Sequence, residues 1–248
     1  MAPIPGLDAA RLFVNVAQDL MTQPDLAATH ERIVSMAVKL TGCTSAAILT
    51  VRPPAGPAVG ASTDPQLAAQ LGRIAAGTTD GPAVQAQLLG RGLNCPSMDS
   101  ERRWPEYARR VLSETAIRSE AAYPLRAEGC DFGVLSMYSV EDGYFRDEVC
   151  SVAEIFTGHA LMAMLLANER NKAANLEIGL LSNREIGMAI GVLMTRHRST
   201  EQQAFDMLRM TSQHDHRKLR EVAADVVLTG QLPALTPRRS DQRSAVVA

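Results

Sequence analysis

The sequence lacks the features that mark membrane proteins, disulfide-bonded secreted proteins and zinc proteins. The longest uninterrupted apolar stretch, residues 160–167, is too short to cross a bilayer, and no basic segment with a long apolar run opens the chain. The cysteines form no C-x-x-C pair, so we predict reduced thiols. We therefore expect a cytoplasmic protein that makes no membrane contact. The four cysteines are Cys43, Cys95, Cys130 and Cys150.

Charge of one sign and catalytic motifs are missing as well. The net charge is only −2, so bulk basicity gives no argument for nucleic-acid binding. No nucleophile elbow, phosphate loop or paired-carboxylate context occurs, which predicts that the protein is not an enzyme. His30 and His159 have no evident second ligand, so we expect no metal and no cofactor. Trp104, the single tryptophan, precedes a proline and is interpreted as a loop anchor.

The chain does contain three short amphipathic segments between residues 183 and 230. The first has apolar residues at helical spacing. Ser199-Thr200-Glu201-Gln202-Gln203 offers a hydroxyl cap with an amide three residues later, which predicts the start of the second helix. The third is expected to run from about His216 to a stop at Gly230. The residues expected to share one small core are Ile186, Ala189, Ile190, Leu193, Met194, Ala204, Phe205, Met207, Leu208, Leu219, Val222, Ala223, Val226 and Val227.

A basic cluster opens the third of these helices. Arg217, Lys218 and Arg220 are expected to leave its apolar stripe, with His214 and His216 beside them near a helix N-terminus that attracts phosphate. Residues 183–230 contain seven basic and six acidic side chains, so placement matters more than net charge. From charge alone, a solvated helix face is the better explanation of the cluster, and only the three-helix pattern makes RNA contact the favoured interpretation.

The three segments resemble an ANTAR domain, the RNA-binding output module of bacterial transcription antiterminators. Two positions depart from the usual pattern: Ile190 stands where many relatives carry a polar residue, and His216 where an asparagine is common. The resemblance is carried by Asn183-Arg184-x-Ile186-x-x-Ala189-x-Gly191-Val192-Leu193-Met194, Ala204-Phe205-x-x-Leu208-Arg209, and Ser212-Gln213-x-x-x-Arg217-Lys218-Leu219-Arg220-x-Val222-Ala223. It implies RNA contacts by Arg184, Arg209, Ser212, Gln213, His216, Arg217, Lys218 and Arg220.

The kind of RNA is limited by two physical facts. The deep, narrow major groove of A-form RNA excludes a helix, so sequence-specific recognition must use exposed loop bases and flanking phosphates. Phe205 is the only aromatic residue in the module and is expected in its core, which argues against an extended base-stacking platform. We therefore expect RNA hairpins with exposed loops as partners. The resemblance further implies tandem hairpins whose binding prevents a terminator from forming.

The first two thirds of the chain predict an antiparallel α+β domain, because strands follow helices without regular βαβ alternation. Helical spacing covers residues 7–20, 26–40, 65–76 and 82–89, and strand patterns cover residues 44–52, 57–62, 119–126 and 131–139, with a turn at residues 127–129.

This order of elements resembles a GAF domain over residues 8–170. The resemblance is carried by Trp104-Pro105, Ser119-Glu120-Ala121-Ala122-Tyr123-Pro124-Leu125, Gly133-Val134-Leu135 and Tyr144-Phe145. It implies a sensor domain with an unidentified small-molecule ligand. The cyclic-nucleotide signature of the family and a convincing bilin-attachment cysteine are not recognisable.

A long helix is expected between the two parts, since residues 146–175 contain no proline. A partial seven-residue repeat along it predicts a homodimer; packing on the domain's own sheet is the equally good alternative. Gly187 and Gly191 share one face, which favours the close approach of another helix over that of an RNA backbone. The repeat consists of Leu165, Glu169, Lys172, Leu176, Leu180, Asn183 and Ile190.

The sequence thus predicts a GAF-like sensor domain (8–170), a helical linker (171–182), an ANTAR RNA-binding domain (183–231) and a disordered tail (232–248). This organisation is that of a signal-responsive transcription antiterminator. Two alternatives stay open. Three short helices with a basic third helix also fit a DNA-binding helix-turn-helix protein, and a redox or haem-type sensor would show itself in an absorption spectrum.

Overall fold

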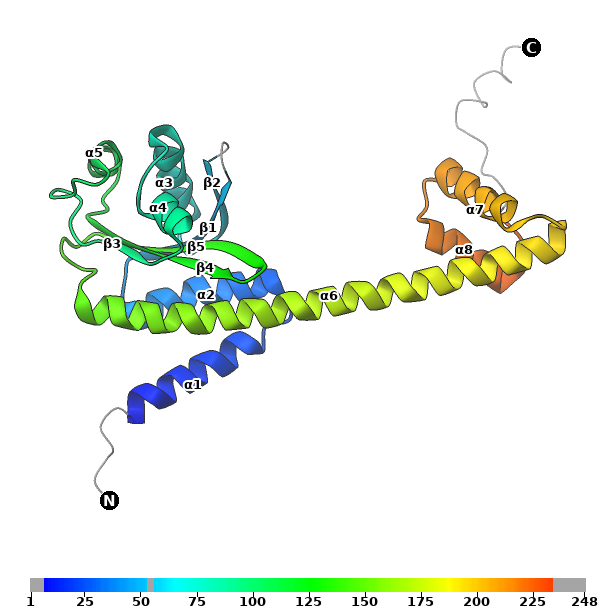
Figure 1. Cartoon of the computed structure of the whole chain (residues 1–248), viewed down its shortest axis with the longest axis horizontal. Helices are drawn as coiled ribbons and strands as arrows, with labels where there is room; N and C mark the ends of the chain where they lie inside the picture. Colours follow the sequence, from blue (N-terminus) through cyan, green and yellow to red (C-terminus); the bar gives the residue numbers. More distant parts are fainter. Residues whose placement is uncertain (1–6, 53–55, 234–248) are drawn as a thin grey trace, which may run out of the picture. The chain divides into compact units, whose positions relative to one another are not determined.

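The computed structural model describes residues 7–52 and 56–233 and divides into two compact units, Met1–Asn171 and Lys172–Ala248. The first unit is built on a five-stranded antiparallel sheet of order β2-β1-β5-β4-β3 (Figure 1). A tight turn joins β4 to β5 and places Gly129 in the left-handed region at φ 75°. The strands are β1 (Ser45–Arg52), β2 (Gly56–Ser62), β3 (Leu93–Cys95), β4 (Ser119–Ala127) and β5 (Cys130–Ser139).

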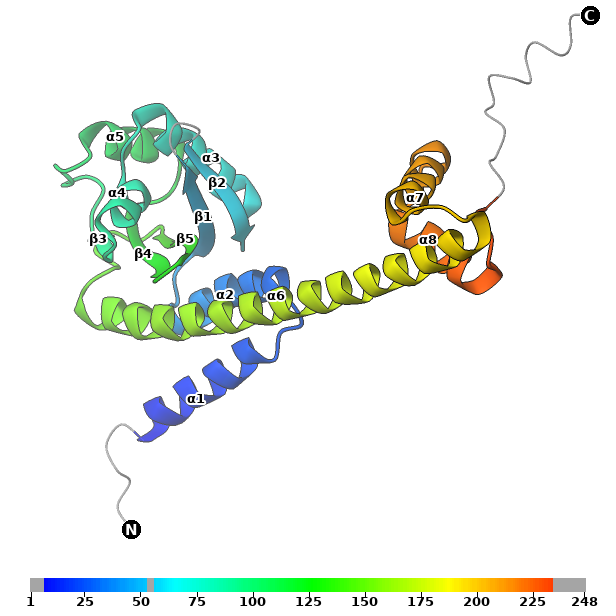
Figure 2. The same cartoon turned by 45° about the vertical axis from the view of Figure 1, so that its right-hand side comes forward.

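Helices cover both faces of this sheet (Figures 1 and 2). On one face lie α2 (Leu26–Thr41) and the first part of α6 (Asp147–His197), with α1 (Leu7–Met21) packed beside them. On the other lie α3 (Pro65–Thr78), α4 (Pro82–Leu89) and α5 (Pro105–Glu114). The fold class is therefore α+β, as predicted.

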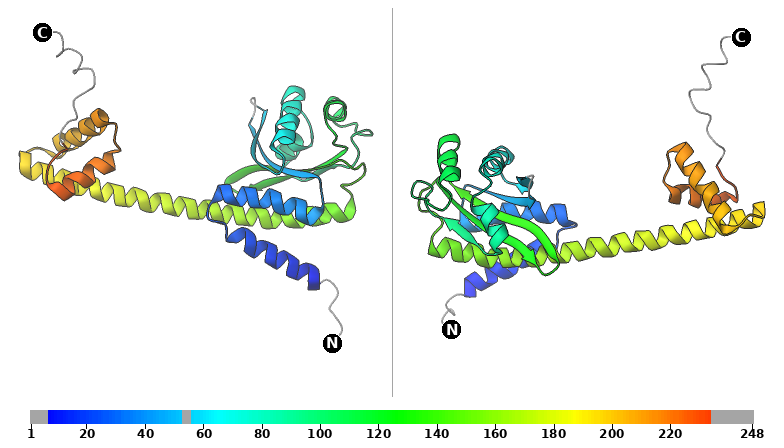
Figure 3. Two further views of the ribbon diagram at one scale, coloured as in Figure 1. Left: turned by 180° about the vertical axis from the view of Figure 1, so that it is seen from behind. Right: turned by 45° about the horizontal axis from the view of Figure 1, so that its top comes forward.

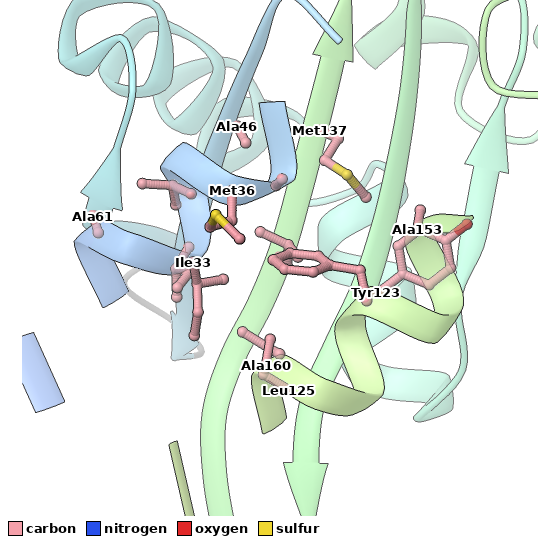
Figure 4. Packing of buried hydrophobic residues seen from close by; sticks show 14 of the residues in the cluster. Ile33, Met36, Ala46, Ala61, Tyr123, Leu125, Met137, Ala153 and Ala160 are labelled. Atoms are coloured by element: carbon pink, nitrogen blue, oxygen red, sulfur yellow. The ribbon is translucent and has the colours of Figure 1, made fainter. Parts of the chain in front are cut away.

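Because helices cover both faces of the sheet, the central strands are buried on both sides. Most residues of β4 and β5 are buried, including chain neighbours whose side chains point to opposite faces of the sheet. Figure 4 shows the core on the α2 side, to which Ile33 and Met36 of α2, Ala153 and Ala160 of α6, and Tyr123 and Leu125 of β4 all contribute side chains. A strand buried on both faces reads as a continuous apolar run.

Local signals set several helix ends. The Asp25 side chain accepts the Ala28 N–H at 2.8 Å and starts α2, and Gly42, left-handed at φ 71°, ends it. The sequence patterns predicted neither β3 nor α5. Trp104 at the start of α5 is only 4% exposed, which confirms its role as an anchor. The guanidinium of Arg103 lies over its ring at 4.2 Å.

The helix α6 is longer than expected. The helix predicted at residues 146–175 and the first C-terminal helix predicted from residue 183 are parts of one continuous element. An 18-residue window of α6 has a mean hydropathy of 1.7, enough by length and composition for a membrane span. Phe156, Ala160 and Met164 of α6 are, however, fully buried in the core under the sheet. One third of the residues in that window are buried, so one face of α6 packs on the core of the first unit.

In the second unit, α7 (Glu201–Asp215) and α8 (Leu219–Thr229) pack with the end of α6 (Figure 3). Thr200 and Gln203 form the predicted capping box at the start of α7. Met194 and Val227 were expected in the core, but they are 37% and 39% exposed. The fully buried apolar residues are Ala189, Leu193, Ala204, Leu208, Val222, Ala223 and Val226.

The third helix begins later than predicted. His216 does not start α8; it ends α7 in the left-handed conformation, at φ 52°, and α8 begins at Leu219. Gly230, at φ 71°, ends α8 as predicted. Of the tail expected to be disordered (232–248), Leu232 packs against the core of the second unit, and residues 234–248 lie outside the described residues.

Candidate nucleic-acid interface

The turn between α7 and α8 is closed by hydrogen bonds to Ser212. The N–H groups of His216 and Arg217 both donate to the Ser212 carbonyl, the latter at 3.1 Å. The Ser212 hydroxyl donates in turn to the Arg217 carbonyl at 2.6 Å. His216 adopts a left-handed conformation that histidine tolerates better than most residues. These contacts fix the backbone that carries the basic cluster.

The cations of the turn differ in their partners. Arg217 Nη1 lies 2.7 Å from Asp225 Oδ2, and this contact raises the pKa of the guanidinium. Lys218 and Arg220 are exposed, and no described residue hydrogen-bonds or ion-pairs with either side chain. An unpaired surface cation needs no internal contact to break before it meets a phosphate. Lys218 and Arg220 are therefore the most available charges of the cluster.

The sequence predicted that the basic cluster lies along one face of the third helix. The structure does not bear this out. Arg217 and Lys218 belong to the turn, where Lys218 is the N-cap residue of α8, and only Arg220 lies in the first turn of the helix. The Lys218 side chain makes no capping hydrogen bond. The acidic Glu221 also lies in this first turn and reduces the local positive potential.

The remaining predicted contacts are spread over α6 and α7. Arg209 and Gln213 are exposed on α7 four residues apart, which places them on one face of that helix. Arg209 pairs with Asp206 at 3.0 Å. Ser212 is half-buried. Arg184 is exposed on α6, and no hydrogen bond or ion pair joins it to the turn within the described part of the chain.

Sequence reasoning missed the two acidic partners of these arginines. The pairing of Asp206 with Arg209 could have been read from its i,i+3 spacing. The pairing of Asp225 with Arg217 could not, because it depends on how the turn brings Arg217 back over α8. Arg196 was missed too: its guanidinium donates to the carbonyl of Gly230 at 3.2 Å, at the end of α8.

The glycine pair on α6 faces open space. A Cβ built on Gly187 or Gly191 would meet no other atom within 4 Å, so the expected close approach of another helix does not occur among the described residues. Gly191 instead lines a shallow hollow of about 680 Å³ with Met188, Thr195 and Val227.

The first unit contains a buried carboxyl group, that of Glu120. Glu120 of β4 is fully buried and accepts a hydrogen bond from the Tyr107 hydroxyl at 2.8 Å. Its other oxygen, Oε1, has no partner among the described residues, and neither has the hydroxyl of buried Ser136. Burial raises the pKa of Glu120 to about 8. The carboxyl is thus largely protonated at neutral pH.

The histidines and cysteines of the first unit show no metal-site geometry. Burial lowers the pKa of His30 and raises that of the Cys95 thiol far above its ordinary value. His159 Nδ1 lies 2.9 Å from the Ile155 carbonyl, and its ring stacks on Phe13 with centroids 5.5 Å apart. Across residues 7–52 and 56–233, no group of three or more metal-ligating side chains comes together.

Both units match known domain families. A GAF domain model matches residues 25–164, more than half of the chain, and an ANTAR domain model matches residues 174–227. The chain therefore belongs to the GAF family and carries an ANTAR domain. GAF and ANTAR domains are regulatory domains, and ANTAR domains bind RNA. The pair defines an RNA-binding antitermination regulator with a GAF sensor domain.

Solved structures agree with this fold. The GAF domain of a phosphoenolpyruvate-protein phosphotransferase from Acinetobacter is 13% identical, with a TM-score of 0.51 over 66% of this chain and 96% of that chain. Free methionine-R-sulfoxide reductase from Neisseria meningitidis is 13% identical, with a TM-score of 0.50 over 68% and 96%. The photosensory core of a Stigmatella aurantiaca phytochrome is 12% identical, with a TM-score of 0.55 over 99% and 52%. No curated protein matches the sequence.

Proposed function

We propose that this protein is a signal-responsive antiterminator that binds hairpin loops of nascent RNA through the turn between α7 and α8. The observation that carries the proposal is the exposure of Lys218 and Arg220 beside a hydrogen-bonded turn, with no internal acidic partner among the described residues. A compact basic turn can contact the exposed bases and phosphates of a loop. It cannot read the bases of an A-form helix through the major groove, which is too deep and narrow for side chains. Bound hairpins would keep a terminator from forming.

The signal would enter through the first unit. We propose a GAF sensor domain over residues 8–170 with a small-molecule ligand that is not yet identified, followed by a linker at 171–182 and an RNA-binding domain at 183–231. Because α6 is continuous from Asp147 to His197, the linker is helical throughout. A continuous helix transmits rotation or displacement better than a flexible chain does. We propose a cytoplasmic location, where nascent RNA is available.

A homodimer through α6 is the further part of this proposal. Leu176 and Leu180 are 66% and 63% exposed, and Ile178 and Leu181 are 49% and 54% exposed. Neighbouring exposed leucines on one helix favour burial against a second copy. Leu165, which the heptad pattern included, packs on the core of the first unit and does not belong to this surface.

The test is a binding experiment with the full chain. RNA hairpins with a randomised loop, the same RNA with the stem disrupted, and duplex DNA of the same sequence would each be titrated with the protein. The proposal expects a preference for the intact hairpin and enrichment of particular loop sequences on selection. Tighter binding to duplex DNA would favour a helix-turn-helix protein and contradict the proposal.

A further inference from the structure

Arg217 is held from both sides of the turn between α7 and α8. Ser212 fixes its backbone, because the Ser212 carbonyl accepts the Arg217 N–H at 3.1 Å and the Ser212 hydroxyl donates to the Arg217 carbonyl at 2.6 Å. Asp225 of α8 holds its side chain through the 2.7 Å contact with Nη1. Backbone and side chain of one basic residue are thus restrained by two residues that lie five and eight positions away.

The restraint leaves part of the guanidinium accessible. A guanidinium carries five N–H donors, and the 2.7 Å contact with Asp225 is made by Nη1. The Arg217 side chain is 37% exposed, so the group reaches solvent. An arginine that is already held in one geometry loses less freedom when it binds a phosphate or a base edge. The other cations of the turn, Lys218 and Arg220, have no such restraint.

We propose that Ser212 and Asp225 are positioning residues, which orient the Arg217 guanidinium for RNA without contacting the RNA themselves. This inference rests on the proposed function. It changes the role expected for Ser212, whose hydroxyl hydrogen is already donated to the Arg217 carbonyl. It also gives a role to Asp225, an acidic residue that would otherwise only repel a phosphate.

The two roles of Asp225 predict opposite results. If Asp225 only adds negative charge, its neutralisation strengthens RNA binding by reducing repulsion. If it orients Arg217, neutralisation weakens binding although the turn has become more positive. The variant Asp225→Asn separates the two, because asparagine keeps the size of the side chain and removes its charge. Glu114→Gln is the matched control, since it neutralises the acid of a similarly exposed ion pair, with Arg110 on α5 of the first unit.

The experiment titrates hairpin RNA, selected from the randomised-loop pool, with the variants Asp225→Asn, Arg217→Ala and their combination. We expect Asp225→Asn to weaken binding several-fold, in the direction of Arg217→Ala. The double variant should bind no more weakly than Arg217→Ala, because residues that act through one another are not additive. Glu114→Gln should bind like the wild type. Circular dichroism should show an unchanged fold, since exposed ion pairs contribute little to stability.

Ser212 provides a second route should Asp225→Asn fail to fold. Ser212→Thr keeps the hydroxyl and should retain binding, whereas Ser212→Ala should lose part of the affinity that depends on Arg217. Unchanged or tighter binding by folded Asp225→Asn, or fully additive losses with Arg217→Ala, would overturn the inference alone. If the wild type binds no hairpin from the pool, the proposed function fails and the inference fails with it.

Discussion

The two units differ in where they place polar side chains. The first unit buries a carboxyl group: Glu120 lies in the core beside Tyr107 and Tyr138. Large aromatic side chains such as Phe156 fill the layer under the other face of the sheet. The second unit exposes its charged side chains, since its fully buried apolar residues are alanine, leucine and valine alone and its cations lie on the surface. Changes of pH should therefore act mainly on the first unit, and changes of salt mainly on RNA binding by the second.

The largest expected effects come from truncating a buried side chain in the core of each unit, and the two losses of stability can be compared. Phe156→Ala removes a fully buried ring from the first unit and should destabilise it by about 3–5 kcal/mol. Leu208→Ala should cost the second unit about 2–5 kcal/mol, a larger share of the stability that its small core can supply. Hydrogen exchange followed by mass spectrometry would localise each loss. Equal loosening of both units by either variant would show that they unfold as one.

The buried acid gives the next largest effect. The pKa of Glu120 is raised from 4.5 to about 8 in the folded state, so the folded state binds this proton more tightly than the unfolded state does. The stabilisation that this proton contributes is fully present below 4.5, the pKa of Glu120 in the unfolded state. It is lost as the pH rises toward about 8, at up to ~1.4 kcal/mol per pH unit. Glu120→Gln should remove this loss, as measured by denaturant unfolding of the first unit.

The interval from pH 6.5 to 8 is the best one for this measurement. His30, whose pKa is lowered by burial, changes stability only below its ordinary value of 6.5. The other titratable groups that face Glu120, the hydroxyls of Tyr107 and Tyr138 and the thiol of Cys95, have raised pKa values and stay neutral there. A wild-type curve as flat as that of Glu120→Gln would mean that the carboxyl is already ionised.

The proposed dimer should respond to charges on its apolar surface. Leu176→Glu with Leu180→Glu places two carboxylates where the exposed leucines would meet a second copy, and we expect monomers in light scattering at micromolar concentration. The matched control is Leu88→Glu with Leu89→Glu, which changes two exposed leucines of the first unit. A wild type that is already monomeric would contradict the dimer.

Periodic signals in the sequence predicted most elements, and tertiary contacts decided the rest. The capping box of Thr200 and Gln203 and the stop at Gly42 are local, so they could be found from spacing alone. The start of α8 could not, because a left-handed His216 depends on the hydrogen bonds of the turn. A signal did exist: relatives commonly carry asparagine at this position, and asparagine favours that conformation.

The sequence predicted which residues form the candidate site but not how they are arranged. The sequence identified Arg217, Lys218 and Arg220, but placed them on one helix face. The structure divides them between a turn and a helix start, and it pairs Arg217 with Asp225. No spacing rule connects residues eight positions apart across a turn. The short strand β3 was missed because the proline and glycine residues around it favoured a loop, and no helix was predicted at α5.

The central claim, that the turn between α7 and α8 binds RNA, is tested most directly by Lys218→Ala with Arg220→Ala. Both side chains are exposed and without a described partner, so the fold should be unchanged. Arg73→Ala with Arg91→Ala removes the same charge from exposed positions of the first unit and serves as the control.

The measurement is the affinity for a selected RNA hairpin as a function of salt. The account predicts weaker binding by the Lys218 and Arg220 variant. Its logarithmic salt slope should fall by about 0.7 to 0.9 for each phosphate that is no longer neutralised by a cation of the protein. The control should keep the wild-type slope. A folded variant that binds the hairpin with wild-type affinity and slope would contradict the account.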